Sequence, residues 1–386
     1  MITPENPPDE YLEDPDPWIS RPLASLKGRG AVSHIIGRYE TQETEAIDDG
    51  WWQDEDGERS ATATHVTHEI AKTILSRNQS PDLPFSVSLN PYRGCEHGCI
   101  YCFARPTHAY LGLSPGLDFE TRLFAKINAA ELLRQELAAP SYLPSSIALG
   151  VNTDAYQPCD RKLQLTRRVL EVLHECRHPV GLITKSSLIE RDMDLLSDMA
   201  RDQLAVAAIT ITTLDHSISR TLEPRAASPT RRLETIHRLT QAGIPTSVSV
   251  APIIPFVTDQ DLEKILTAAF DAGATCAGYT ILRLPWEVNP LFQQWLEVHF
   301  PDRAERVMNR VRDMRGGKDY DATFGSRMSG EGLWADMIRQ RFEKTLKRLN
   351  IGRSSRFNWL DTNKFRKPLN VPGKKKRGDE QLDFFS

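Results

Sequence analysis

The chain has 386 residues, of which 40% are hydrophobic, and its 48 basic and 52 acidic residues give a formal net charge of −4. This length carries one large or two ordinary domains, and the charge balance points to no class of partner. With no signal peptide at the start, no run of about 18 apolar residues and only six cysteines, we expect a soluble, cytoplasmic, disulfide-free protein outside the membrane.

The two ends of the chain differ in charge. Residues 1–60 hold 15 acidic against 5 basic side chains, and we expect this segment to be largely disordered over its first part. Within it, Lys27–Ala31 is a small basic loop, either an ordered strap over the main domain or a functional contact. Residues 351–386 form a basic tail.

From about residue 84, strands and helices alternate. We expect strands at 85–89, 146–151, 180–184, 204–211, 246–250 and 275–281. We expect helices at 119–137, 161–174, 192–200, 229–242 and 259–272. Such alternation implies parallel pairing with right-handed crossovers, and six units are too few for a full eight-fold barrel. The sequence therefore predicts an α/β core over 61–290, a partial (β/α)6 TIM-like barrel, with a helical C-terminal extension over 291–350 and flexible termini.

Three cysteines, Cys95, Cys99 and Cys102, follow the first strand with the spacing C-x3-C-x2-C. Thiolates bind iron–sulfur clusters, and a cubane cluster has four irons, so three protein ligands leave one iron open to another molecule. A structural zinc site is the alternative, with His97 or His108 as a fourth ligand. No second cysteine or histidine pair follows downstream, which favours iron and sulfur.

This spacing, with Tyr101 just before the last cysteine, resembles the signature of the radical SAM superfamily, whose known core is also a partial barrel. The resemblance implies a [4Fe-4S] cluster on the three cysteines, whose open iron is chelated by S-adenosylmethionine. It further implies reductive cleavage of that cofactor to a 5′-deoxyadenosyl radical, with electrons from a reductant such as flavodoxin or ferredoxin. The backbone around Tyr101 is then expected to lie against the adenine.

Polar residues at the predicted strand ends are the next candidates, because ligands of α/β barrels bind there. Asn152 and Asp154 follow the second strand and offer acceptors for the amino group of S-adenosylmethionine, although Asn-Thr-Asp is also ordinary turn chemistry. Lys185 follows the third strand and either pairs with the carboxylate of the ligand or is solvated.

The fourth strand is followed by further polar groups. The hydroxyl of Thr212 suits ribose recognition, while Arg220 and Arg225 are suited to a carboxylate or phosphate. A structural ion pair between Arg220 and Glu223 is an equal alternative.

Residues 80–290 look most similar to the spore photoproduct lyase-like branch of the superfamily. Among the shared features are the Thr184-Lys185 pair and the segment Leu222–Arg225. The bacterial members closest in the cysteine loop have no assigned substrate. True spore photoproduct lyase returns a hydrogen atom from a cysteine near the end of strand two. Here the nearest thiol is Cys159, a candidate hydrogen donor or an inert packing group. We therefore do not expect this chain to repair thymine dimers.

The terminal residues Gln381–Phe385 resemble the peptide that docks bacterial proteins on the DNA sliding clamp. The basic segment before them either contacts phosphates of nucleic acid or solubilises the tail. Three functions remain open. They are a radical SAM enzyme acting on an unidentified substrate, the same chemistry directed at nucleic acid, and a zinc-stabilised nucleic-acid-binding protein without catalysis.

Overall fold

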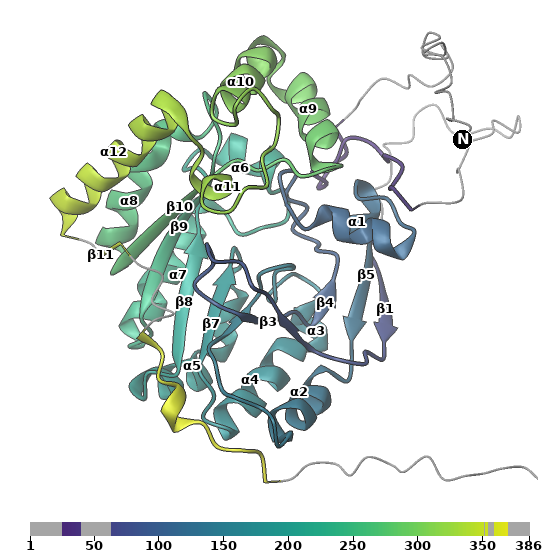
Figure 1. Ribbon diagram of the computed structural model, residues 1–386, viewed down its shortest axis with the longest axis vertical. Helices are drawn as coiled ribbons and strands as arrows, with labels where there is room; N and C mark the ends of the chain where they lie inside the picture. The colour runs from purple at the N-terminus through teal and green to yellow at the C-terminus, as the bar shows by residue number, and fades with distance from the viewer. Residues whose placement is uncertain (1–24, 40–62, 351, 354–358, 370–386) are drawn as a thin grey trace, which may run out of the picture.

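The computed structural model describes residues 25–39, 63–350, 352–353 and 359–369 (Figure 1). The remaining parts of the acidic N-terminal segment and of the basic tail lie outside the described residues. So does the clamp-like peptide Gln381–Phe385. Among the described residues, no helix has the length and apolar character that crossing a bilayer requires.

The core is one eight-stranded sheet with the order β11-β10-β9-β8-β7-β6-β3-β2. Its strands are β2 (Leu75–Arg77), β3 (Val87–Leu89), β6 (Ile147–Leu149), β7 (Val180–Thr184), β8 (Ala205–Thr210), β9 (Thr246–Ile253), β10 (Cys276–Ile281) and β11 (Gly352–Arg353). All neighbours pair in parallel except β2, which is antiparallel to β3. Because β2 and β11 end the sheet at opposite edges, the barrel is open. The predicted partial barrel is confirmed.

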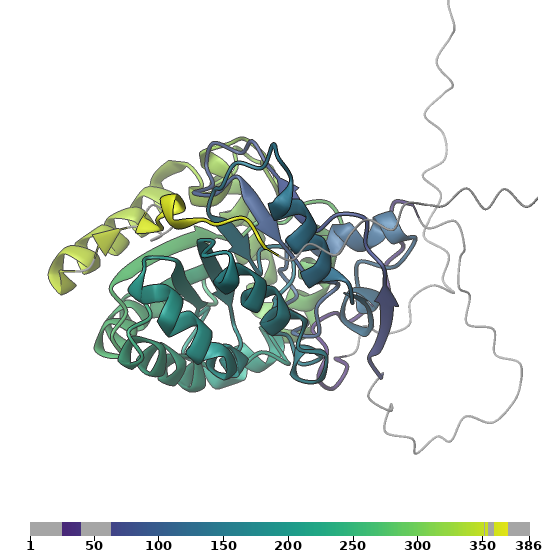
Figure 2. The same ribbon diagram turned by 90° about the horizontal axis from the view of Figure 1, so that it is seen from below.

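Helices between the strands cover the outer face of the sheet (Figure 2). They are α3 (Asp160–Leu163), α4 (Leu165–Glu175), α5 (Met193–Arg201), α7 (Pro229–Gln241) and α8 (Leu262–Asp271), with short 3-10 turns η2 (Ser187–Asp192) and η3 (Asp259–Asp261). The helix α6 (His216–Leu222) lies instead at the carboxyl ends of the strands (Figure 1). Local sequence explains α7 well. The side chain of Ser228 caps its first turn, Pro229 occupies the first helical position, and Gly243 with φ of 76° follows its end.

The predicted helix over 119–137 is wrong. The structure has α1 (Leu117–Thr121), then β5 (Arg122–Lys126), then α2 (Ala129–Ala138). Leu123 and Ala125 alternate with more exposed neighbours, and β5 pairs with β1 (His65–Glu69) and β4 (Tyr92–Arg93) in a separate three-stranded sheet. Pairing with two distant segments overrides the helical propensity of this stretch.

The C-terminal region is helical, as predicted, with α9 (Val288–His299), α10 (Pro301–Asp313), α11 (Ser326–Ser329) and α12 (Gly332–Leu349). α12 lies beside α8, and its Ile338, Phe342 and Leu346 join the main hydrophobic core. α9 and α10 lie above the carboxyl ends of the strands (Figure 1). There, Trp295 belongs to a second apolar cluster that includes Cys99 and Tyr101. This extension therefore forms part of the wall around the cysteine loop.

Candidate active site

The cysteine loop lies between β4 and the 3-10 helix η1 (Arg105–Leu111), at the carboxyl ends of the barrel strands (Figure 1). Cys95 and Cys99 are buried, and Cys102 is half-buried. The backbone N–H of Cys95 donates to Phe119 O at 2.9 Å, and that of Ile100 donates to Leu222 O at 3.1 Å. The loop is thus anchored on one side by α1 and on the other by α6.

Arg105 holds the cysteine loop in place through its side chain, which is completely buried. Its guanidinium donates to Cys99 O at 2.9 Å and to Gly98 O at 3.1 Å. It also donates to the backbone before α1 and forms an ion pair with Glu120. Sequence reasoning missed this residue. The available signal was an arginine placed three residues after the last cysteine of the motif.

Glu120 extends this support to the N-terminal segment. Its carboxylate accepts hydrogen bonds from the backbone N–H of Gly30 at 3.0 Å and of Ala31 at 2.9 Å, while Arg29 donates to its carbonyl oxygen at 3.0 Å. A Cβ added to Gly30 would lie only 1.9 Å from Gly98 O, so the segment passes very close to the cysteine loop. Of the two interpretations of Lys27–Ala31, the structure supports the ordered strap.

Gln157 and Arg225 hold the other side of the loop. The buried amide of Gln157 accepts from Glu96 N at 2.8 Å and donates to Gly94 O at 3.2 Å. The Arg225 guanidinium lies 3.1 Å from the Glu96 carboxylate. Arg225, which the sequence suggested as a ligand-binding residue, therefore pairs with the loop itself. Gln157 carries no motif that would have revealed its role.

Asp154 is saturated with protein donors. Its carboxylate accepts from the Thr184 hydroxyl at 2.7 Å, from Lys185 N at 2.8 Å and from Tyr156 N at 2.9 Å, and it lies 3.3 Å from His97 Nδ1. Burial would raise the pKa of Asp154, but His97 and these hydrogen bonds lower it to about 2. The residue ties the end of β6, the end of β7 and the cysteine loop together.

Asn152 lies two residues earlier in the same turn. Its backbone N–H donates to the Asn90 side chain at 2.9 Å. Its own side chain is half-buried and makes no hydrogen bond within the described residues. Of the two residues suggested for the amino group, Asn152 thus keeps its acceptor available, whereas Asp154 uses its oxygens within the protein.

Tyr101, Lys185 and Thr212 come together around the carboxylate of Glu223. The Tyr101 hydroxyl donates to Glu223 and lies 3.2 Å from Thr212 Oγ1, which is 2.6 Å from the same carboxylate. Lys185 Nζ lies 5.7 Å from the centroid of the Tyr101 ring. Burial would raise the pKa of Glu223, but the charges of Arg232 and Lys185 lower it. Tyr101 and Thr212 therefore form a buried hydrogen-bonded network with Glu223, and the half-buried Lys185 lies beside it.

The structural ion pair between Arg220 and Glu223, one of the two alternatives for Arg220, does not form, because Glu223 pairs with Arg232. Glu223 is the C-terminal cap of α6 and has φ of −143°, so its side chain leaves the helix face that Arg220 occupies. Arg220 is exposed on α6.

Cys159 precedes α3 and packs with Tyr92, Ala125 and Leu165 in a small apolar cluster. Burial raises the pKa of its thiol above the ordinary value, as does the charge of Glu96. These surroundings favour a packing role over hydrogen donation.

The donor set fits an iron–sulfur cluster better than a zinc ion. Among the described residues, no three His, Cys, Asp or Glu side chains converge on a point suited to a single metal ion. A cubane makes no such demand, because each thiolate binds a different iron. His97 contacts Asp154, and His108 Nε2 lies 2.9 Å from Arg122 O while its ring packs on Phe119. Each histidine thus has a contact within the protein, although His108 Nδ1 is buried without a hydrogen-bond partner among the described residues.

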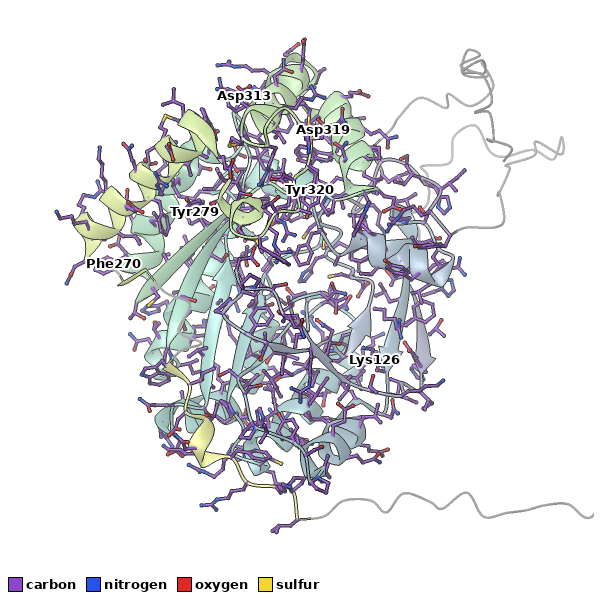
Figure 3. The ribbon with its side chains drawn as sticks, in the orientation of Figure 1. Lys126, Phe270, Tyr279, Asp313, Asp319 and Tyr320 are labelled. Atoms are coloured by element: carbon purple, nitrogen blue, oxygen red, sulfur yellow. The ribbon has the colours of Figure 1, made fainter. Side chains whose placement is uncertain are left out.

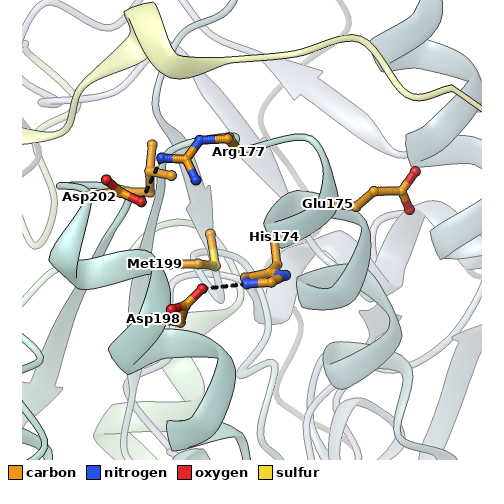
Figure 4. Close-up of a pocket in the computed structure, with 7 residues that line it drawn as sticks. His174, Glu175, Arg177, Asp198, Met199 and Asp202 are labelled. Atoms are coloured by element: carbon orange, nitrogen blue, oxygen red, sulfur yellow. Dashed lines mark hydrogen bonds and ion pairs between the residues drawn. The ribbon is translucent and has the colours of Figure 1, made fainter.

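A shallow hollow lies far from the loop, at the opposite end of the strands, between α4 and α5 (Figure 4). Its charged side chains are engaged in ion pairs, that of Glu175 with Arg134 outside the hollow. His174 contacts Asp198 at 2.8 Å, and Arg177 contacts Asp202. Salt bridges account for these side chains, so the hollow does not compete with the cysteine loop as an active site.

Comparisons with known proteins agree with this geometry. The sequence model of the radical SAM superfamily matches residues 89–269. An uncharacterized protein of Mycobacterium bovis is 36% identical over 249 residues, which are 64% of this chain and 73% of the relative. An uncharacterized protein of Methanocaldococcus jannaschii is 25% identical over 241 residues, 62% of this chain and 86% of the relative. The chain belongs to the radical SAM superfamily, which implies S-adenosylmethionine and an iron–sulfur cluster as cofactors.

Solved structures of spore photoproduct lyase share the fold. A point variant of that enzyme aligns with a TM-score of 0.54 at 12% identity, over 74% of this chain and 79% of the other. Spore photoproduct lyase complexed with dinucleoside spore photoproduct aligns with a TM-score of 0.53 over the same shares, also at 12% identity. The expected similarity to this branch is confirmed at the level of the fold.

Proposed function

We propose that this radical SAM enzyme holds one [4Fe-4S] cluster on Cys95, Cys99 and Cys102 and abstracts a hydrogen atom from a substrate that is still to be identified. When bound, the reduced cluster supplies the electron that cleaves S-adenosylmethionine to methionine and a 5′-deoxyadenosyl radical. The observation that carries the proposal is the placement of three thiols on one loop at the carboxyl ends of the strands, held by buried side chains on both sides.

The residues around the loop divide into two groups. Arg105, Gln157 and Asp154 use their polar atoms on the protein and act as positioning residues, since a displaced loop would separate the thiolates. Asn152 and Lys185 are the groups that we propose to contact the amino and carboxylate ends of S-adenosylmethionine. Asn152 offers a free acceptor, and Lys185 is a cation beside Cys99 and Tyr101.

Two further proposals concern the remaining candidates. Thr212 lies beside Tyr101 and is suited to the ribose, although its hydroxyl is already bonded to Glu223. Arg220 is exposed, so it suits an anion that arrives from solvent.

The proposed partners are a flavodoxin or ferredoxin as reductant and, through Gln381–Phe385, the DNA sliding clamp. A cytoplasmic location would suit an oxygen-sensitive cluster.

Nucleic acid is the second candidate substrate. The fold is shared with spore photoproduct lyase, which has been solved in complex with dinucleoside spore photoproduct. The basic tail of this chain would add sequence-independent attraction to phosphates. This candidate keeps the same radical chemistry and changes only the hydrogen donor, so deuterium transfer from a labelled oligonucleotide into 5′-deoxyadenosine would distinguish it.

The test of the proposed function is cleavage of S-adenosylmethionine by the full chain, reconstituted anaerobically with iron and sulfide and reduced with dithionite. We expect 5′-deoxyadenosine from the wild type and none from Cys99→Ala. Cys176→Ala is the matched control, because it removes a buried thiol from the hydrophobic core away from the loop. It should retain cleavage. A reconstituted wild type that releases no 5′-deoxyadenosine would overturn the proposal.

A further inference from the structure

Arg283 follows β10 by two residues, and its guanidinium has only weak partners. Nη2 donates to the Tyr320 hydroxyl at 3.3 Å, and Nη1 lies 3.5 Å from the sulfur of Met328. Nε is buried and has no hydrogen-bond partner among the described residues. A guanidinium carries five donors in a planar fork, so most of the donor capacity of Arg283 is unused.

The charge of Arg283 is also unpaired. Among the described residues, no carboxylate lies within ion-pair distance of it, and two acidic side chains of the surrounding segments are paired with other arginines. Asp319 binds Arg312 at 2.7 Å, and Asp82 binds Arg327 at 2.6 Å. Asp321 accepts hydrogen bonds from the backbone and hydroxyl of Thr323.

A second guanidinium adds to this positive charge. Arg315 is buried and donates to Ser326 O at 2.8 Å and Leu282 O at 2.9 Å, with no carboxylate in ion-pair distance among the described residues. Burial lowers the pKa of Arg315, and the neighbouring charge of Arg283 lowers it further. Two adjacent, partly dehydrated cations that form no ion pair with a described carboxylate are unfavourable for the free protein, and the more distant charges of Asp321 and Glu331 offset only part of this cost for Arg315. An anion supplied from outside would offset this cost.

The position of Arg283 connects it to the catalytic loop. Its guanidinium lies over the ring of Phe103 at 5.2 Å from the centroid, and Phe103 directly follows the cluster ligand Cys102. The Phe103 side chain is 41% exposed. Tyr320, between α10 and α11, lies over the carboxyl end of the sheet (Figure 3). The cation therefore stands at the rim of the barrel beside the cysteine loop, where an arriving substrate would meet it.

We propose that Arg283, stacked on Phe103, binds an oxyanion of the substrate, a phosphate or a carboxylate group. This inference rests on the proposed function and names the class of substrate, an anionic molecule. Both oxyanions fit the planar fork of arginine in the same bidentate manner. Arg315 supports the site through its charge, since its own donors are used by backbone carbonyls.

The test measures the binding of inorganic phosphate and of acetate to the full, reconstituted chain by calorimetry at constant ionic strength. Arg283→Met keeps an apolar stem against Phe103 but removes the charge. We expect it to weaken binding of the preferred anion by about tenfold or more. The matched control is Arg306→Met, because Arg306 also stacks on a phenylalanine ring, that of Phe256 at 3.9 Å, but on the exposed side of α10. It should bind like the wild type.

Thermal unfolding separates a lost site from a damaged fold. Without added anion, Arg283→Met should melt at or above the temperature of the wild type, because it removes an unpaired charge. Phosphate should raise the melting temperature of the wild type more than that of the variant. The proposal is overturned if neither anion binds the wild type, or if both bind wild type and variant equally. It is also overturned if the variant loses affinity only for S-adenosylmethionine. None of these readouts requires turnover, so they fail independently of the cleavage assay.

Discussion

Glu223 and Arg232 form an ion pair in which each side chain is only 1% exposed. The pair lies next to Tyr101, whose hydroxyl donates to the Glu223 carboxylate. Removing one partner of such a pair leaves a buried charge without compensation, which typically costs 3–5 kcal/mol. The pair therefore holds the residue that precedes the last cysteine of the loop.

We expect Arg232→Met to lower the free energy of unfolding by roughly 3–5 kcal/mol, since the Glu223 carboxylate is left buried and unpaired. Urea denaturation measures this change. Arg220→Ala tests the alternative partner and should alter stability by less than about 0.5 kcal/mol. If the Arg220 variant is destabilised as strongly as the Arg232 variant, the assignment of this ion pair is wrong.

Arg105→Met should destabilise the chain by roughly 3 kcal/mol or more, because Glu120 loses its buried partner and the cysteine loop loses two donors. Less iron should be retained after reconstitution and desalting. The control is Arg122→Met, whose ion pair with Asp118 is long, at 3.7 Å, and largely solvated on the arginine side. Equal iron retention in the two variants would contradict a positioning role for Arg105.

Gly30→Ala should displace the N-terminal strap, because the new methyl group has no room beside Gly98 O. Overpacking of this kind typically costs about 1–3 kcal/mol. Hydrogen exchange of the Gly30 and Ala31 amides, which donate to Glu120, should become faster. At Gly278 on β10 an added Cβ meets no atom of the described residues within 4 Å, so Gly278→Ala is the control. Unchanged exchange in Gly30→Ala would show that the strap is not closely packed.

Stability should fall between pH 7 and pH 5 through His178. Burial lowers the pKa of this imidazole from 6.5 to about 4, and its ring accepts a hydrogen bond from Tyr142 at 2.7 Å. Since the folded pKa lies below the unfolded one, the stabilisation is complete above pH 6.5 and is lost as the pH falls toward 4. Between pH 7 and pH 5 His178 accounts for about 2 kcal/mol of this loss.

Urea denaturation at pH 7 and pH 5 measures the effect, and His178→Gln should show a correspondingly weaker pH dependence. Burial also lowers the pKa of His108 to about 4, and this residue contributes the same pH dependence of stability in both proteins. An identical pH dependence of wild type and variant would contradict the neutral, buried state of His178.

The alternation of strands and helices was predictable because both faces of the parallel strands are buried. β8 and β7 are continuous apolar runs bounded by polar residues, and such runs reveal strands from sequence alone. β5 was not predictable in this way. Its pairing with β1 and β4 depends on segments far apart in the chain, while its local composition suits a helix.

The three cysteines were visible in the sequence because their chemistry requires a fixed spacing. The residues that hold the cysteine loop in place were not visible in the sequence. Arg105 and Gln157 act through contacts with backbone carbonyls and amides, which set no sequence pattern. Glu223 was recognised as a possible ion-pair partner, but its real partner, Arg232, lies on the next helix. Only the backbone geometry at the end of α6 decides between Arg220 and Arg232.

Metal and sulfide analysis of anaerobically purified protein tests the central claim most directly. A cluster on Cys95, Cys99 and Cys102 predicts about four irons and about four acid-labile sulfides per chain after reconstitution, with loss of both in Cys99→Ala. One tightly bound zinc per chain and no acid-labile sulfide would contradict the account.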